Sequence, residues 1–212
     1  TVLDPFVGVG STLKACALTG RNGIGFELYP HFAALTRQRL EAEVPVEALE
    51  STTQTIWEGD VRILVNKLEA ESIDLIVTSP PYRGILNKKP DHKVKAERLD
   101  SGLAVNYGDD PRDLANITDY EGFIEELAAS LEDCAKALKQ KGYMVLVVGD
   151  FRHKSRYYLF HADIARALEE RGLTLQAMNV LYQRHKRVFP YGYPYAYVPN
   201  VHHQNIVDLR TL

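Results

Sequence analysis

Short apolar runs alternate with longer stretches that repeat apolar residues at helical spacing, and this alternation predicts βα units around a mainly parallel sheet. The predicted strands cover residues 1–3, 23–27, 55–58, 73–78, 143–148, 174–182 and 205–209. The predicted helices cover residues 11–18, 30–43, 61–68, 118–140 and 159–171. No internal repeat or low-complexity linker interrupts the pattern, so we expect one α/β domain spanning residues 1–212.

The composition is that of an ordinary globular protein, with 45% hydrophobic and 25% charged residues. No apolar run reaches the roughly 18 residues that a membrane span requires, and no signal peptide opens the sequence. The two cysteines, Cys16 and Cys134, fall in apolar helical stretches, so we expect a reduced, cytoplasmic protein. Because the sequence opens directly in an apolar strand at Thr1, we also expect further residues upstream.

The segment from Asp4 to Ser11 (DPFVGVGS) joins the first strand to the first helix and contains Gly8 and Gly10. Glycines at such a turn let the backbone approach a ligand closely, and the helix that follows offers free N–H groups. Glu27, at the end of the second strand, is placed to accept hydrogen bonds from two ribose hydroxyls. This arrangement fits NAD, FAD or S-adenosylmethionine, and it also occurs as a structural turn beside a solvated glutamate.

Two details favour S-adenosylmethionine among the three cofactors. The spacing Gly-x-Gly lacks the third glycine of the dinucleotide fingerprint. Asp4 would repel a pyrophosphate but would attract the ammonium group of a methionine moiety. The expected cofactor-binding residues of this loop and strand are Asp4, Phe6, Gly8, Gly10, Ser11 and Glu27.

The predicted strand at 73–78 ends in Ser79-Pro80-Pro81-Tyr82, because two consecutive prolines continue neither a strand nor a helix. This tetrad therefore lies at the carboxyl edge of the sheet, where open α/β folds bind ligands. The Ser79 hydroxyl and a backbone carbonyl of the Pro-Pro unit would accept hydrogen bonds from an exocyclic amine and polarise it toward attack. Tyr82 supplies a ring on which an extruded base can stack. We expect Ser79, Pro80, Pro81 and Tyr82 to be catalytic, although plain Pro-Pro loops are common.

Together, DPFVGVGST, GIGFE and DLIVTSPPY resemble the motifs of the DNA amino-methyltransferases, the N4-cytosine and N6-adenine family. Weaker matches at KALKQKGYMVLVVGD and VHHQNIVDLR extend the resemblance over nearly the whole chain. The resemblance implies a Rossmann-like methyltransferase fold, α/β with a mainly parallel sheet and an antiparallel last strand, with S-adenosylmethionine as cofactor. It also implies that Asp60 faces the cofactor's adenine and that DNA is the substrate, as in restriction–modification. A tetrad that begins with serine is more similar to cytosine enzymes, which favours N4 of cytosine.

Other functions fit the same motifs. The tetrad also suits an adenine N6-methyltransferase, and RNA and protein-glutamine methyltransferases carry closely similar tetrads, generally with Asn or Asp in first place. A non-catalytic cofactor-binding subunit is a further alternative. It is motivated by two departures from the family: no cofactor-binding segment is recognisable before Thr1, and the candidate recognition regions are small.

Two loops, residues 83–116 and 183–200, are the expected DNA contacts. The first holds six Lys/Arg and two acids between Arg83 and Arg98, and the second combines a basic cluster with five aromatics in residues 189–197. Such loops suit contacts with phosphates and unstacked bases despite the net charge of −3. A solvated loop or a loop at a dimer interface could have the same composition. The expected contact residues are Arg83, Lys88, Lys89, Arg184, Lys186, Arg187, Tyr191 and Tyr193.

The expected partners are DNA and, beyond it, a second copy of the chain or a separate specificity subunit. We expect no membrane association. We also expect no metal, because the histidines, among them His202 and His203, lack cysteine or carboxylate partners at ligand spacing.

Overall fold

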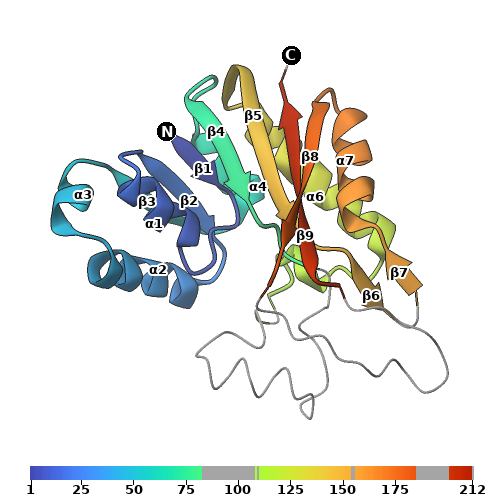
Figure 1. The fold of residues 1–212 in the computed structure, drawn as a ribbon, viewed down its shortest axis with the longest axis horizontal. Helices are drawn as coiled ribbons and strands as arrows, with labels where there is room; N and C mark the ends of the chain where they lie inside the picture. Colours follow the sequence, from blue (N-terminus) through green and yellow to red (C-terminus); the bar gives the residue numbers. More distant parts are fainter. Residues whose placement is uncertain (83–107, 109, 154–155, 185–200, 212) are drawn as a thin grey trace, which may run out of the picture.

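The computed structural model describes residues 1–82, 108, 110–153, 156–184 and 201–211, to which all structural statements refer. Its centre is a seven-stranded sheet with the order β3-β2-β1-β4-β5-β9-β8 (Figure 1). The strands are β1 (Val2–Asp4), β2 (Gly23–Glu27), β3 (Gln54–Glu58), β4 (Ile73–Thr78), β5 (Leu138–Val148), β8 (Thr174–Tyr182) and β9 (His203–Arg210). Among the described strands of this sheet, only β9 runs against its neighbours, and it pairs antiparallel with both β5 and β8. The expected sheet, mainly parallel with an antiparallel last strand, is confirmed.

The strand order reverses between β1 and β4, which lie side by side in the sheet. They pair in parallel, with Val2 opposite Leu75 and Leu3 opposite Ile76. Because both strands end at the same edge, the glycine loop after β1 and the proline tetrad after β4 emerge next to each other. Open α/β sheets bind ligands at such a switch point.

Helices cover both faces of the sheet. On one face, α4 (Val61–Leu64), α6 (Tyr120–Ala135) and α7 (Phe160–Glu169) pack on the main core, which includes the fully buried Leu3, Phe123 and Phe160. On the other face, α1 (Ser11–Leu18) and α2 (Pro30–Glu43) enclose a smaller cluster around Leu13 and Leu40. Figure 1 shows α1, α2 and the short α3 (Val46–Glu50) beside β1 to β3, whereas α6 lies behind the other half of the sheet and α7 lies beside β8.

Most element boundaries agree with the sequence pattern, and those of β2, β4, β8, α1 and α2 agree at both ends. The predicted helix 118–140 is wrong at its ends. Asp119, rather than Thr118, caps it, because the Asp119 carboxylate accepts the N–H of Gly122. The helix stops at Ala135, and Leu138 already pairs with Ile73 of β4, before Lys141 adopts a positive φ of 61°.

Four elements were not predicted from the sequence, and one of them is η2 (Leu114–Asn116), which lies within the predicted loop 83–116. The other three are α3 and the strands β6 (Phe151–His153) and β7 (Arg156–Tyr158), which form a separate antiparallel pair. Two short 3-10 helices, η1 (Val65–Lys67) and η2 (Leu114–Asn116), complete the described elements. None of the helices in the described part of the chain is long and apolar enough to cross a membrane.

Candidate active site

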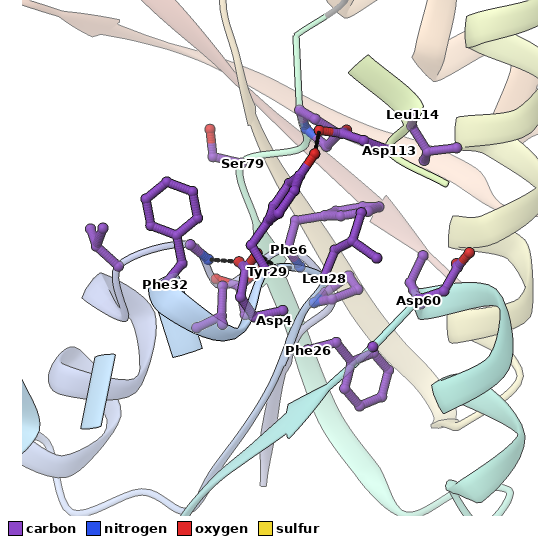
Figure 2. Close-up of a pocket in the computed structure, with 18 of the residues that line it drawn as sticks. Asp4, Phe6, Phe26, Leu28, Tyr29, Phe32, Asp60, Ser79, Asp113 and Leu114 are labelled. Atoms are coloured by element: carbon purple, nitrogen blue, oxygen red, sulfur yellow. Dashed lines mark hydrogen bonds between the residues drawn. The ribbon is translucent and has the colours of Figure 1, made fainter. Parts of the chain in front are cut away.

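A cavity of about 330 Å³ opens at the carboxyl ends of β1, β2 and β4, near the lower end of the size range of small-molecule sites. Aromatic and aliphatic side chains line much of it: Phe6, Val7, Phe26, Leu28, Tyr29, Phe32 and Leu114. Polar groups converge on it from five segments: Asp4, Glu27, Asp60, Ser79 and Asp113. In Figure 2, Ser79 and Asp60 lie on opposite sides of this cavity. The sheet edge therefore gathers residues that are far apart in the sequence.

The glycine loop turns through two left-handed positions, Gly8 at φ 55° and Gly10 at φ 82°. A Cβ on Gly10 would come within 2.3 Å of the Thr36 side chain, so the loop packs tightly on α2 there. A Cβ on Gly8 would meet no atom within 4 Å. Gly8 lines the cavity whereas Gly10 does not. The first glycine thus leaves room for a ligand, and the second lets the loop approach α2.

Glu27 is buried at the end of β2, and no described residue forms an ion pair with it. Its Oε2 accepts the N–H of Gly8 at 3.0 Å, and its Oε1 accepts the N–H of Tyr29 at 2.9 Å. Burial raises the pKa of Glu27 to about 7, and the nearby charges of Asp113 and Asp4 act in the same direction, while the two N–H donors oppose the change. Each oxygen keeps one lone-pair direction for a ligand.

Asp4 is more deeply enclosed than Glu27. Its Oδ1 accepts hydrogen bonds from the Thr78 hydroxyl at 2.6 Å and from the N–H of Phe6 at 3.1 Å. Burial raises the pKa of this carboxyl despite these donors. Asp4 therefore ties the glycine loop to the end of β4, and its expected contact with a ligand ammonium stays a prediction.

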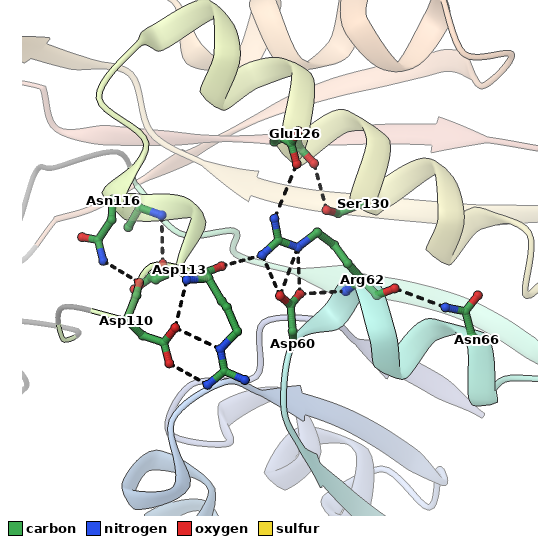
Figure 3. A network of polar contacts seen from close by, with 10 residues as sticks. Asp60, Arg62, Asn66, Asp110, Asp113, Asn116, Glu126 and Ser130 are labelled. Carbon is green, nitrogen blue, oxygen red and sulfur yellow. Dashed lines mark hydrogen bonds and ion pairs between the residues drawn. The ribbon is translucent and has the colours of Figure 1, made fainter.

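Asp60 lies at the start of α4, where its side chain caps the helix by accepting the N–H of Arg62 at 3.0 Å. The Arg62 guanidinium also holds both carboxylate oxygens, with Nη2 2.6 Å from Oδ2 (Figure 3). Burial alone would raise the pKa of Asp60, but the hydrogen bonds from Arg62 outweigh it and lower the pKa. Arg62 in turn donates to the Arg112 carbonyl at 2.9 Å and lies 3.5 Å from a Glu126 oxygen.

Residues 112–114 also line the cavity, and the sequence pattern did not identify them as part of the site. Figure 2 shows Tyr29 pointing across the cavity to Asp113, and its hydroxyl donates to Asp113 Oδ2 at 2.9 Å. Asp113 Oδ1 accepts the N–H of Ala115 at the start of η2. Burial and the Asp113 hydrogen bond both raise the pKa of Tyr29. The only sequence signal here was the acid-rich run Asp109-Asp110-Pro111-Arg112-Asp113, which is not specific to any ligand.

The tetrad begins with an exposed Ser79, which lines the cavity together with Pro81. The Ser79 hydroxyl donates to the Val147 carbonyl of β5 at 3.0 Å. Pro80 is buried and does not line the cavity. The hydroxyl hydrogen of Ser79 is thus engaged, and its lone pairs remain free to accept.

Tyr82 projects toward the ends of β5 and β9 rather than into the cavity. Its hydroxyl oxygen accepts the N–H of Gly149 at 2.9 Å and the amide of Gln204 at 3.4 Å, and its ring meets Phe160 edge-on at 5.7 Å. Gln183 extends this network by donating to Gln204 at 2.9 Å. Tyr82 is therefore fixed by its hydroxyl and by its ring.

The cavity brings together most of the predicted cofactor and catalytic residues: Asp4, Phe6, Gly8, Ser11, Glu27, Asp60, Ser79 and Pro81. It leaves out Gly10, Pro80 and Tyr82, which lie in the adjoining segments. Of the expected DNA contacts, Arg184 is exposed just after β8. Arg83, Lys88, Lys89, Lys186, Arg187, Tyr191 and Tyr193 lie outside the described residues. Within the described residues, no group of three or more His, Cys, Asp or Glu side chains could hold a metal ion.

The start of the chain matches a known protein family. Residues 1–38 match the sequence profile of a family described as DNA methylase. A stretch of 39 residues is 51% identical to the type II methyltransferase M.MthZI of Methanothermobacter thermautotrophicus, and this stretch covers 18% of this chain and 11% of that protein. The chain thus aligns with about a tenth of the length of this curated relative. The resemblance to DNA amino-methyltransferases is confirmed on the segment that holds the glycine loop and Glu27.

Solved structures extend the likeness to the whole chain at the level of fold. A magnesium protoporphyrin IX methyltransferase of Synechocystis PCC 6803, solved with bound S-adenosylmethionine, is 16% identical with a TM-score of 0.52, over 100% of this chain and 69% of that one. An S-adenosylmethionine-dependent methyltransferase of Methanosarcina mazei is 13% identical with a TM-score of 0.52, over 100% and 92%. These likenesses confirm the expected Rossmann-like methyltransferase fold.

Proposed function

We propose that this chain, which shares its N-terminal motif with the DNA methylase family, transfers the methyl group of S-adenosylmethionine to an exocyclic amino group of a DNA base. One observation carries the proposal. A single cavity is lined by the glycine loop and Glu27, which suit a nucleoside cofactor, and by Ser79 and Pro81 of the tetrad, which suit an amine. The cofactor and the amine would therefore meet at the switch point between β1 and β4.

The residues of the cavity fit S-adenosylmethionine. The open space at Gly8 admits a ligand close to the backbone, and the free lone pairs of Glu27 suit the two ribose hydroxyls. Phe6, Phe26 and Leu28 provide apolar surface for an adenine ring. Because Asp60 and Ser79 lie on opposite sides of the cavity, the adenine end of the cofactor would lie near Asp60 and its methyl end near Ser79.

S-adenosylmethionine would supply a methyl group on a sulfonium, which is already a good leaving group. The chain would contribute mainly alignment of the amine with that methyl group. Ser79 donates its own hydrogen to Val147, so its oxygen can accept an N–H of the amine and orient it. Pro80 and Pro81 lack N–H groups and therefore place no competing donor beside the amine. Tyr82 lies outside the cavity but directly after Pro81, and we propose that the extruded base, with its amine at Ser79, stacks on the half-buried ring of Tyr82, which Gly149 and Phe160 fix.

Replacing Ser79 tests the assignment. In Ser79→Ala, methyl transfer should fall at least about 100-fold, the usual scale for losing one orienting group, while S-adenosylmethionine affinity stays unchanged. Ser72→Ala is the matched control, because Ser72 precedes β4 at its other end and its hydroxyl, among the described residues, donates only to the Glu69 carbonyl. Radiolabelled transfer to duplex DNA measures the rate, and calorimetry measures cofactor binding. Equal rates for the two variants would contradict the role of Ser79.

The finer proposal is that the product is N4-methylcytosine, and it rests on the serine in first place of the tetrad. Mass spectrometry of nucleosides from treated DNA identifies the base. N6-methyladenine would overturn the choice of base but keep the reaction. Methyl groups found only on RNA or on protein glutamine would overturn DNA as the substrate. Cofactor binding without transfer to any acceptor would favour a non-catalytic subunit.

A further inference from the structure

The antiparallel pair β6–β7, which no sequence motif singled out, begins directly after the carboxyl end of β5. The N–H of Gly149 is bonded to the hydroxyl of Tyr82, and β6 starts two residues later at Phe151. Figure 1 shows β6 and β7 at the end of the sheet where β5 terminates. The pair therefore leaves the sheet beside the tetrad.

Aromatic packing fixes the base of this pair. Phe151 and Tyr158 face each other across the two strands and stack at 5.1 Å with an interplanar angle of 14°. Phe151 also contacts Phe160 at 6.1 Å, and Phe160 contacts the ring of Tyr82 at 5.7 Å. One aromatic cluster thus holds both the tetrad tyrosine and the β6–β7 pair, so their relative position is set by packing.

Asp150 adds a polar anchor at the same place. Its carboxylate is buried, and its Oδ1 lies 2.7 Å from His161 Nδ1 at the start of α7 and 3.3 Å from the His161 backbone nitrogen. Its Oδ2 is 3.5 Å from the hydroxyl of Tyr157 in β7. Asp150, the acid that directly precedes β6, is therefore turned inward, so its negative charge does not lie on the outer surface of the pair.

Two of the exposed side chains of the pair are arginines, which are cationic. Arg152, His153 and Arg156 are all exposed, and neither arginine forms an ion pair with any described residue. The Arg152 guanidinium lies over the ring of Tyr157 at 5.1 Å, and that of Arg156 lies over Tyr158 at 4.9 Å. These cation–π contacts orient the guanidinium groups without neutralising them. Two pre-oriented, unpaired arginines are suited to binding phosphate oxygens.

We propose that the β6–β7 pair binds the phosphate backbone of the DNA strand that carries the target base, through Arg152 and Arg156. This inference rests on the proposed function, because the position beside Tyr82 matters only if a nucleic acid reaches the tetrad. Phosphate contacts set the register of a protein on a duplex without reading its sequence. The pair would therefore hold the duplex near the tetrad while other residues select the site.

The salt dependence of DNA binding tests the proposal. Each phosphate contact adds a slope of about −0.9 to the plot of log affinity against log salt, so Arg152→Gln with Arg156→Gln should reduce the slope by about 1.8. At 100 mM salt this corresponds to about 8-fold weaker binding per contact and about 60-fold for both. Anisotropy of a labelled duplex of mixed sequence, titrated from 50 to 200 mM salt, gives the slope.

The control is Lys141→Gln, an exposed cation at the opposite end of β5, about 23 Å from Val148 at strand spacing. Arg152→Lys with Arg156→Lys keeps the charge and should keep the slope, which separates phosphate binding from loss of packing on the tyrosines. Cofactor binding checks the fold of every variant. The same slope for the Gln double variant and for Lys141→Gln would overturn the proposal.

Methyl transfer distinguishes this inference from the proposed function. If the inference holds, the Gln double variant should show a raised KM for DNA with an unchanged kcat and unchanged cofactor affinity. A wild-type protein that methylates DNA, with a slope that does not depend on the two arginines, contradicts the inference alone. A wild-type protein that binds DNA through the arginines but methylates no DNA contradicts the proposed function alone.

Discussion

Two carboxylates of the same cavity, Glu27 and Asp60, are held in opposite ways. Glu27 is buried, the described residues offer it only backbone N–H donors, and burial raises its pKa to about 7. Asp60 is also buried, but the Arg62 guanidinium donates hydrogen bonds to both of its oxygens and lowers its pKa. The sequence alone suggested the same task for both acids, namely contact with the cofactor.

The difference indicates a division of roles. A carboxylate that lacks a cation gains most from donors that a ligand brings, because such donors replace lost hydration. A carboxylate already paired with arginine gains little from a further donor and acts mainly to hold the backbone. We therefore expect Glu27 to determine cofactor affinity, and Asp60 to position the start of α4 and the Arg112 segment (Figure 3).

The largest effect is expected for Glu27→Gln. The amide keeps one acceptor oxygen and loses the charge, so cofactor affinity should fall between about 10- and 100-fold, the range for hydrogen bonds to a charged group. Glu58→Gln is the matched control, because Glu58 pairs with Glu27 at the end of the neighbouring strand β3 and is exposed. Calorimetry with S-adenosylmethionine measures both. Similar affinities would show that Glu27 does not bind the ribose.

The next effect concerns pH. Ribose donors favour the ionised carboxylate, so the cofactor should bind about 10-fold more weakly at pH 6 than at pH 8, given a pKa of about 7 for Glu27. Binding near pH 7 should release a proton, which calorimetry in buffers of different ionisation enthalpy detects. Glu27→Gln should remove both effects. An affinity that does not change between pH 6 and 8 would contradict the raised pKa or the role of the carboxylate.

The same pKa has a consequence for the stability of the ligand-free protein. The folded protein holds the Glu27 proton more tightly than the unfolded chain, whose carboxyl titrates near 4.5. The contribution of this group to stability is therefore full below pH 4.5 and is lost as pH rises through about 7, by at most about 3 kcal/mol. Urea unfolding at pH 5 and pH 8 should show this decline in the wild type and not in Glu27→Gln.

A smaller effect is expected for Asp60→Asn. Asparagine keeps the helix cap, so the change removes mainly the charge that holds Arg62, and stability at pH 7 should fall by about 1–2 kcal/mol. Because the folded pKa of Asp60 is lowered, its contribution is present above the ordinary value and is lost as pH falls below it. The difference between wild type and variant in urea unfolding should therefore shrink as pH falls below the ordinary carboxyl value of 3.8, with cofactor affinity changed only a few-fold.

Asp110→Asn is the control for this variant. Asp110 and Arg112 repeat the Asp-x-Arg spacing of Asp60 and Arg62, with the same 2.6 Å contact, but Arg112 is exposed. Such surface pairs contribute little. If Asp60→Asn weakens cofactor binding as much as Glu27→Gln does, the proposed division of roles is wrong.

The sequence predicted the elements that carry the cavity because local rules dominate there. The glycines force the turn after β1, the prolines end β4, and apolar runs mark the buried parallel strands. The loop, Glu27 and Ser79 could therefore be placed at one sheet edge. Asp60 and Arg62 are also close in the sequence, but the sequence does not show whether the Asp60 carboxylate bonds to Arg62 or to a ligand. The structure shows that it bonds to Arg62.

What the sequence did not predict depends on contacts between distant residues. Tyr29 and Asp113 form a hydrogen bond although they are 84 positions apart in the sequence, and Tyr82 and Gln204 form one at a separation of 122 positions. The β6–β7 pair has strands of three residues each, too short for a periodic pattern, and it is stabilised by aromatic packing on α6 and α7. Side chains that depend on such tertiary contacts leave no periodic signal in a single sequence.

The smallest expected effect comes from Tyr29→Phe, which tests whether the wall formed by Asp113 adds to the site of Glu27. Removing the hydroxyl leaves Asp113 bonded to Ala115 but breaks its link across the cavity. We expect a loss of about 1 kcal/mol in stability and a two- to fivefold loss in cofactor affinity, because a neutral donor to a partly exposed pair contributes little. Tyr143→Phe is the control, since Tyr143 is exposed on β5 and its hydroxyl bonds to no described residue. Urea unfolding and calorimetry give the two numbers. A loss as large as that of Glu27→Gln would mean that Asp113, which the sequence motifs do not mark, determines cofactor binding as much as Glu27 does.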